Sequence, residues 1–574
     1  MDWIKKNKDI LFGLFIFGIT LYLIKPYKYN FAINDDWDFY LHVKYFLNGI
    51  YVKNAFIDSA FILQGFIATL WAKIFGLSFI NLRLLTLVFL AIFLSGVYVF
   101  SGNYISDQKK KVFLLLTIVF NPLILISSLS FMTEIYFLAF FIWSLVFFLK
   151  YVETRRLSSL IKFSLLTGAS LLVRQFGFVL LVSYALGLII LFFKERNKKL
   201  LIDLVTFIAV FGVFFLVLLV FPKVPSRIVD DVGFAKHTLK LFSTFEDLRE
   251  SLYVVPFVVV YLSYFLLPVQ FIHRYSLKLK ESLPLILVGF LIATILYRFA
   301  IFPIGNVIYI ERLFSKTDYI SVMTLFDNKV FKVALSVLLG INFSFLLYKT
   351  IKSTKVYQGL IYNPFTLVYA SLCILMFIVA FVAQGSFERY FANFFVLTTI
   401  FYFINNTRDD LSWKAFLPAF SILWIISTFL VWDFFSSEGL KWKLAEKIQP
   451  QISDTENIHL SPTYLRFSHS TKQKDPYKLQ VNRREKNFRC QIQRLYRGGD
   501  SDFYKTLSSI EKSKQIRKYL KNPDIYKGKT SVGFRDINYY EYRIVLQEEY
   551  FTPLNMFFNR KSYIAVFCFN EGKN

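Results

Sequence analysis

The stretch AFILQGFIATLWAKIFG, residues 60–76, decides how this chain is threaded through a membrane. It is apolar, but it is short for a membrane-spanning helix and contains Gln64 and Lys73. If it crossed the bilayer, the basic cluster at residues 109–111 would face outward. Short loops rich in lysine and arginine stay in the cytoplasm, so we predict a helix at the outer interface, anchored by Trp71 and Lys73.

The composition is that of a polytopic membrane protein. Of the 574 residues, 56% are hydrophobic, and the mean hydropathy is +0.49. The first apolar run has no small-residue cleavage site after it, so we interpret it as a retained span. With the N-terminus in the cytoplasm, we predict 13 spans, at residues 9–24, 82–100, 112–128, 135–151, 158–173, 176–193, 201–221, 251–271, 283–300, 330–348, 363–383, 390–404 and 415–432.

This threading places every compact basic cluster on the cytoplasmic side, as the positive-inside rule requires. The net charge of +27 is then explained by cytoplasmic loops and their attraction to anionic lipid headgroups. No motif of nucleic-acid-binding proteins is present, which argues against nucleic acid as a partner. We expect a multi-pass protein of the cell membrane.

We predict two domains, with the boundary where the composition turns polar and basic. Residues 1–432 form the membrane domain, including a first outer loop at 25–81 with interfacial helices, and residues 433–574 form a soluble α+β domain outside the cytoplasm. In the second domain, residues 530–547 and 562–570 are predicted strands and residues 502–520 a predicted amphipathic helix. Cys490 and Cys568 lie there and can pair if this domain is outside the cytoplasm, whereas Cys373 lies within an apolar span.

The same threading gathers ionisable residues on the outer face. Charged groups at or below a membrane interface are costly, and they are usually paired or functional. The chemistry of this chain is therefore expected on that face. The acidic residues there include Asp35, Asp36, Asp38, Glu134 and Glu388, and the arginines are Arg174, Arg312 and Arg389.

Three carboxylates lie within four positions in NDDWDFYLHVKYFLNGI, residues 34–50, which has the apolar stripe of a helix. Asn34 or Asp35 is placed to cap this helix, with Asp38 three residues later. Capping explains one acid. Three adjacent carboxylates repel one another unless a cation or a catalytic use compensates. The sequence is therefore compatible with a capping role and with a functional role for these acids.

Two further patterns lie in this stretch. The spacing of Asp36 and Asp38 resembles a DxD metal element, and a divalent metal is possible through these two carboxylates. A three-residue motif is too weak a signal by itself, so we predict no metal site. His42 follows Asp38 by four residues and lies on the same helix face. That position suits a hydrogen bond to Asp38, a metal pair, or a structural histidine whose hydrogen bonds are satisfied.

Residues 34–49, followed by FILQGFIATLWAKIFGLSFINLRLLTLVFLAIF, resemble the first outer loop and second span of the GT-C glycosyltransferases. These membrane enzymes include the family 39-like protein O-mannosyltransferases and the bacterial lipid A aminoarabinose transferase. The resemblance continues through FNPLILISSLSFMTEIYFLAFF, LLTGASLLVRQFGF and GSFERYF in the same order, over about residues 1–430. It implies a GT-C fold of about 13 transmembrane helices.

The resemblance also implies an activity. Such enzymes move a sugar from a polyprenyl-phosphate donor to an acceptor in the cell envelope, with inversion at the anomeric carbon. By position, the acid that acts as general base is Asp35 or Asp36, with Asp35 favoured because it heads the helix. Arg389 matches the arginine that holds the lipid phosphate, and Arg174 and Arg312 are weaker candidates. Glu134 matches an acid that faces the cavity; the further candidates for substrate binding are Asp38, His42, Glu388 and Tyr390.

Simpler interpretations stand beside these. Arg389 can be an interface anchor beside Glu388, Arg174 can mark the outer end of two short spans, and Glu134 can cap the fourth span. A polytopic transporter or flippase of lipid-linked sugars is the rival function, and a membrane anchor with a binding tail is a third. Transporters need polar residues and broken helices at mid-membrane. The middles of these spans are almost wholly apolar, which favours chemistry at the outer face.

Overall fold

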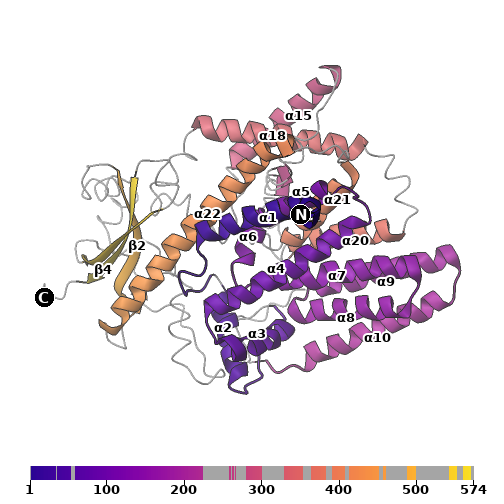
Figure 1. Cartoon of the computed structure of the whole chain (residues 1–574), viewed down its shortest axis with the longest axis horizontal. Helices are drawn as coiled ribbons and strands as arrows, with labels where there is room; N and C mark the ends of the chain where they lie inside the picture. The colour runs from indigo at the N-terminus through magenta and orange to yellow at the C-terminus, as the bar shows by residue number, and fades with distance from the viewer. Residues whose placement is uncertain are drawn as a thin grey trace, which may run out of the picture. The chain divides into compact units, whose positions relative to one another are not determined.

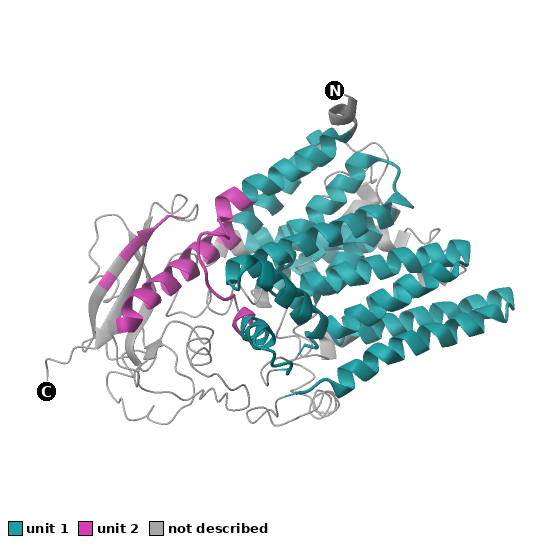
Figure 2. Cartoon of the chain, turned by 60° about the horizontal axis from the view of Figure 1, so that its bottom comes forward, with its two compact units in different colours: residues 1–20, 38–307, 332–428 teal, residues 21–37, 308–331, 429–574 magenta. Residues whose placement is uncertain are grey.

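The computed structural model describes residues 2–33, 35–53, 59–223, 258–259, 262–263, 266, 279–299, 329–352, 364–382, 391–406, 413–451, 457–459, 488–498, 542–551 and 560–569. These residues form helices and one small sheet (Figure 1). The chain divides into two compact units, coloured in Figure 2. Unit 1 comprises residues 1–20, 38–307 and 332–428, and unit 2 comprises residues 21–37, 308–331 and 429–574.

Within the described residues, six helices are long and apolar enough to cross a membrane. The chain is therefore a multi-pass membrane protein, and each of these helices coincides with a predicted span. They are α1 (Asp2–Ile24), α4 (Phe79–Gly102), α7 (Thr133–Thr154), α9 (Gly177–Glu195), α10 (Lys199–Val220) and α22 (Trp413–Ile448).

Further apolar helices occupy most of the remaining predicted spans. They are α8 (Leu157–Val173), α15 (Leu279–Phe299), α18 (Lys329–Lys352), α20 (Pro364–Val382) and α21 (Ala392–Asn406). The predicted span at 251–271 lies largely outside the described residues. The two predicted helices of the first loop form as α2 (Asp36–Leu47) and α3 (Ile62–Phe75). The total of 13 spans stays a prediction.

One predicted span is not a continuous helix. Residues 112–128 fall in two helices, α5 (Gln108–Val119) and α6 (Pro122–Ser128), which are bent by 77° at the break. The cause is local, because Pro122 has no N–H to donate to a preceding carbonyl and disfavours helix at the residue before it. Asn121 then caps the new helix, its Oδ1 accepting the Leu123 N–H at 2.9 Å.

The last long helix, α22, extends well past the predicted end of its span at residue 432. It continues to Ile448, and the turn after it contains Pro450. No proline interrupts the chain between Pro418, near its start, and that turn, so nothing in the backbone requires the helix to end where the apolar run ends.

In unit 1, α7 packs against α8 and α4, and α10 packs against α8 and α9 (Figure 1). Short turns join α7 to α8, α8 to α9 and α9 to α10, so these helices alternate in direction.

At one end of this group of helices lie Arg155, Arg156 and residues 194–199, with Arg155 paired to Glu195. We call it the basic end. The opposite end, where α7 begins and α8 ends, we call the site end. Lysines and arginines gather at the basic end as the positive-inside rule predicts for a cytoplasmic face.

Two glycines let α15 and α18 approach closely within unit 1. A Cβ on Gly289 would lie 2.8 Å from the Ile341 Cα, and one on Gly340 would lie 2.7 Å from the Ala293 backbone nitrogen. Small residues at such a crossing let helix backbones come into contact, which is how helices associate within lipid.

In unit 2, the sheet has the order β1 (Asn457–His459), β2 (Phe488–Gly498), β4 (Arg560–Phe569) and β3 (Tyr542–Tyr550). β1 is parallel to β2, and the other two pairings are antiparallel. The predicted strands at 530–547 and 562–570 are represented by β3 and β4, while the predicted helix at 502–520 lies outside the described residues.

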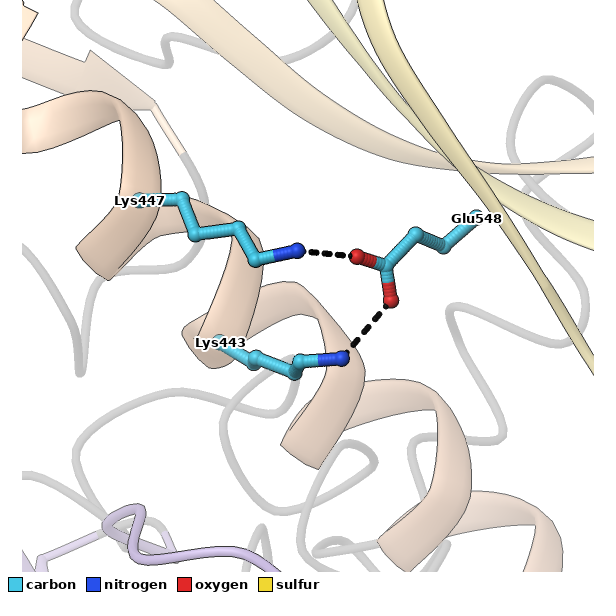
Figure 3. A network of polar contacts seen from close by, with 3 residues as sticks. All are labelled: Lys443, Lys447 and Glu548. Carbon is cyan, nitrogen blue, oxygen red and sulfur yellow. Dashed lines mark hydrogen bonds and ion pairs between the residues drawn. The ribbon is translucent and has the colours of Figure 1, made fainter.

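Ionic and aromatic contacts join the other parts of unit 2 to the end of α22. Glu548 on β3 accepts from Lys447 at 2.5 Å and from Lys443 at 2.9 Å (Figure 3). These two pairs lower the pKa of the Glu548 carboxyl, since each ammonium favours its charged form. Phe31 lies edge-on to Phe435, with ring centroids 5.6 Å apart.

The α15–α18 contact is tested by replacing Gly340 with leucine. The added side chain has no space beside Gly289 and Ala293, so we expect a loss of about 1–3 kcal/mol in stability. The matched control is Gly212→Leu in α10, where a Cβ would meet nothing within 4 Å. Melting of the protein in detergent measures both. Equal melting temperatures for the two variants would contradict the close packing.

Candidate functional site

The first turn of α2 distinguishes the two leading acids. The Asp36 N–H donates to the Ile33 carbonyl at 3.1 Å, and the Asp36 Oδ2 accepts the Ile33 N–H at 3.3 Å. The Asp36 side chain is fully buried. Asp35, which precedes it in the turn, is only half-buried, and Asn34 lies outside the described residues. The Asp36 carboxylate thus closes the turn that leads into α2 by bonding the backbone three residues before it. The capping of α2 by Asn34 or Asp35 stays a prediction.

Further along α2, in unit 1, Asp38 and His42 are both buried. Among the residues that the structure describes, neither ring nitrogen of His42 has a hydrogen-bond partner. The expectation of a hydrogen bond between Asp38 and His42 is therefore wrong, as is that of a satisfied structural histidine. Aromatic packing holds the ring instead, with the Phe46 and Phe61 centroids 4.3 Å and 5.1 Å away.

The burial of His42 fixes its charge. Removal from water disfavours the imidazolium, and the ammonium of Lys53 repels it, so the pKa of His42 falls to about 3. The ring is neutral at physiological pH, with one nitrogen a donor and the other an acceptor.

The start of α3 joins α2 to the site end of the bundle. Phe61 adopts a left-handed backbone conformation with φ of 54°, and its N–H donates to the Val173 carbonyl at 3.1 Å. Its ring stacks on Phe39 of α2, with centroids 4.4 Å apart. Gln64 Nε2 reaches the Phe131 carbonyl at 3.5 Å, whereas Gln64 Oε1 is buried without a hydrogen-bond partner. The loop helices are thus attached to the ends of the long helices.

Glu134 and Arg174 form a buried ion pair at the site end, with Arg174 Nη1 2.7 Å from Glu134 Oε1. Their side chains are only 2% and 6% exposed. Glu134 lies in the first turn of α7 and Arg174 follows the last residue of α8, so each charge complements the dipole of its own helix. The Arg174 guanidinium also lies 5.1 Å from the centre of the Phe176 ring.

This pairing was not predicted. The sequence analysis interpreted Glu134 as a capping acid and Arg174 as the mark of a span end. Each interpretation described one member of the ion pair. The available signal was an acid at the start of one predicted span and a base at the end of the next, both on the predicted outer face.

Sequence reasoning also missed two buried cations. Arg83 is 2% exposed in the first turns of α4, and Lys53 is 9% exposed after α2. Thr86 of α4 lies 3.1 Å from the Tyr136 hydroxyl of α7, which places the start of α4 at the site end as well. A single arginine within the apolar run NLRLLTLV was the visible signal for Arg83.

The remaining candidates lie outside the described residues. These are Arg312, Glu388, Arg389 and Tyr390. Within the described part of the chain, no group of three or more His, Cys, Asp or Glu residues is arranged to hold a metal ion. A metal held by Asp36 and Asp38 is therefore unsupported, and the Asp36 carboxylate bonds the backbone of Ile33.

Two structures of one protein are among the solved structures similar to this chain. The crystal structure of ArnT from Cupriavidus metallidurans bound to undecaprenyl phosphate is 12% identical and covers 98% of each chain, with a TM-score of 0.40. The apo state of that ArnT is also 12% identical and covers 79% of this chain and 83% of its own, with a TM-score of 0.35. No family model and no curated protein sequence matches the chain.

The ion pair can be tested by a double-mutant cycle. Arg174→Met leaves the Glu134 carboxylate buried without its guanidinium, so we expect a loss of about 3–5 kcal/mol in stability. Adding Glu134→Gln removes the stranded charge, and most of the stability should return. The free energy of unfolding in detergent is measured for the parent, the two single variants and the double variant. Additive losses would show that the two side chains do not act as a pair.

The environment of His42 predicts a specific pH dependence. Because the folded pKa of about 3 lies below the unfolded value of 6.5, stability is fully present above pH 6.5 and is lost as the pH falls toward 3. The limiting slope is about 1.4 kcal/mol per pH unit. His42→Leu should remove this component, and at pH 7.5 it should melt no lower than the parent, since it deletes an unsatisfied polar group. If stability changes with pH by the same slope in the parent and in His42→Leu, His42 is not a buried neutral residue.

Proposed function

We propose that the chain is an integral membrane glycosyltransferase that moves a sugar from a polyprenyl-phosphate donor to an acceptor of the cell envelope. The reaction takes place on the extracytoplasmic face and inverts the anomeric carbon. The observation that carries the proposal is the gathering of buried ionisable groups at the site end, opposite the basic end. Such groups are expensive in a membrane protein and are retained where chemistry or binding uses them.

The general base is Asp35. Its neighbour Asp36 is fully buried and bonds the Ile33 N–H, whereas Asp35 retains exposure at the head of α2. The Asp35 carboxylate takes the proton of the acceptor hydroxyl while that oxygen attacks C1 of the sugar. The C1–O bond to the lipid phosphate breaks on the opposite face, and the phosphate leaves with the bonding electrons.

The leaving phosphate needs cations. Arg174 is the described candidate, since the ion pair with Glu134 fixes its position and a guanidinium can bind phosphate through more than one N–H. Arg389 and Arg312 complete the proposed phosphate-binding set. Glu134 would orient Arg174 and also face the substrate.

Hydroxyl groups of the sugar or the acceptor are the proposed ligands of the remaining polar groups. The neutral ring of His42 supplies one donor and one acceptor, and Gln64 Oε1 supplies a further acceptor. All three atoms are buried without a hydrogen-bond partner among the described residues. Asp38 belongs to the same helix as His42. Glu388 and Tyr390 are the proposed contacts from the segment that carries Arg389.

A transporter or flippase of lipid-linked sugars is the second candidate, and the break between α5 and α6 is the observation that favours it. Broken helices in transporters offer backbone groups to a substrate or ion. Here side chains bond the backbone at the break. Asn121 accepts the Leu123 N–H, and the Ser427 hydroxyl donates to the Phe120 carbonyl at 2.7 Å. This favours a structural bend over a transport site.

The proposal is tested with Asp35→Asn and its matched control Asp36→Asn. Loss of the base should reduce sugar transfer from polyprenyl phosphate by about 100- to 10,000-fold, with little change in stability. Asp36→Asn retains a side-chain oxygen that can accept the Ile33 N–H, so its transfer rate should stay within several-fold of the parent. The measurement is transfer of labelled sugar in detergent or liposomes.

Three outcomes oppose this assignment. Full activity in Asp35→Asn would remove the proposed base. Loss of activity only in Asp36→Asn would move that role to Asp36. Movement of lipid-linked sugar between the leaflets of a liposome, without transfer to any acceptor and unaffected by Asp35→Asn, would favour the flippase.

A further inference from the structure

Two of the three cysteines of the chain are opposite each other in the sheet of unit 2. β2 and β4 are antiparallel, and their register runs without a shift from Cys490 opposite Cys568 to Gly498 opposite Arg560. The two positions are far apart in the sequence, and only the pairing of these strands brings them together. The third cysteine, Cys373, lies in α20 of unit 1.

The backbone geometry of this position suits a disulfide. Residues directly opposite in an antiparallel pair have Cα atoms about 4.5 or 5.5 Å apart, depending on which of the two alternating pair types they form. Disulfides join Cα atoms about 4.4–6.8 Å apart, so both pair types satisfy this Cα requirement. The Cβ atoms lie closer together in the non-hydrogen-bonded type, which suits the bond better. Opposite residues also share a face of the sheet.

We propose that Cys490 and Cys568 form an intramolecular disulfide in a domain that is exposed to an oxidising compartment. Disulfides persist outside the cytoplasm and are rare within it. This agrees with the predicted threading, in which residues 433–574 lie outside. The inference stands apart from the proposed glycosyl transfer, because it concerns the sulfur chemistry of unit 2 and uses no residue of the site.

The bond forms by thiol–disulfide exchange with an extracytoplasmic dithiol/disulfide oxidant. One cysteine thiolate attacks the disulfide of the oxidant, giving a mixed disulfide, and the second thiolate displaces the oxidant. Two electrons pass to the oxidant. Its two sulfurs take up the two protons that the thiols of Cys490 and Cys568 lose, so the oxidant ends as a dithiol.

The cross-link would connect the two central strands of the sheet order β1-β2-β4-β3. The loop that it closes contains β3, which pairs with β4 and carries Glu548. Glu548 in turn bonds Lys443 and Lys447 near the end of α22 (Figure 3). A covalent β2–β4 pair therefore limits opening of the strands through which the sheet contacts this helix.

Thiol counting on the full-length protein tests the proposal. Membranes are denatured in the presence of N-ethylmaleimide to block free thiols; the protein is then reduced and labelled with a polymer-tagged maleimide, whose additions are counted on a gel. The parent should acquire two tags, from Cys490 and Cys568. Cys490→Ser and Cys568→Ser should each acquire none, and Cys373→Ser should still acquire two.

The remaining outcomes overturn the proposal. No tags on the parent would show that all three thiols were free, and a tag on Cys490→Ser would show that Cys568 is bonded to another partner. Asp35→Asn should still acquire two tags even though it is expected to lose sugar transfer. A failure of the disulfide is thus distinguishable from a failure of the proposed enzyme.

Discussion

The buried ion pair between Glu134 and Arg174 is the contact on which the site end of unit 1 depends. It joins the start of α7 to the end of α8 with two opposite charges that are nearly removed from water. In such surroundings a charge without its partner is strongly destabilising, so neither helix end can move away without a large cost. The Val173 carbonyl beside Arg174 accepts the Phe61 N–H, which attaches the loop helices to the same point.

A second constraint is the need to satisfy backbone groups where no water reaches them. At the α5–α6 break, the side chains of Asn121 and Ser427 form hydrogen bonds with backbone groups. At the head of α2, the carboxylate of Asp36 accepts a backbone N–H. This second case bears on the proposed function, because a carboxylate that closes a turn is poorly placed to take a proton from a substrate, and for that reason we propose Asp35 as the base.

His42 and Gln64 are among the residues whose buried side-chain atoms are exceptions to this general satisfaction. Most buried polar atoms in proteins have a hydrogen-bond partner, and those that have none call for an explanation. The ring nitrogens of His42 and the Oε1 of Gln64 lie where α2 and α3 meet the long helices. A substrate hydroxyl at this point would remove the desolvation penalty of these groups, which gives a physical reason to retain them in an aromatic setting.

The sequence by itself determined the membrane class, the positions of the long helices, the basic end and the stretch that carries the acids. Each follows from local composition, because the length of an apolar run and the charge of a short loop act independently of distant residues. The break before Pro122 was also readable in the local sequence, although a continuous span was predicted there. Only the tertiary structure decided that Glu134 pairs with Arg174, that His42 has no hydrogen-bond partner among the described residues, and that Cys490 lies opposite Cys568. Such pairings join residues far apart in the chain, and they are set by helix packing and strand register, which no local pattern encodes.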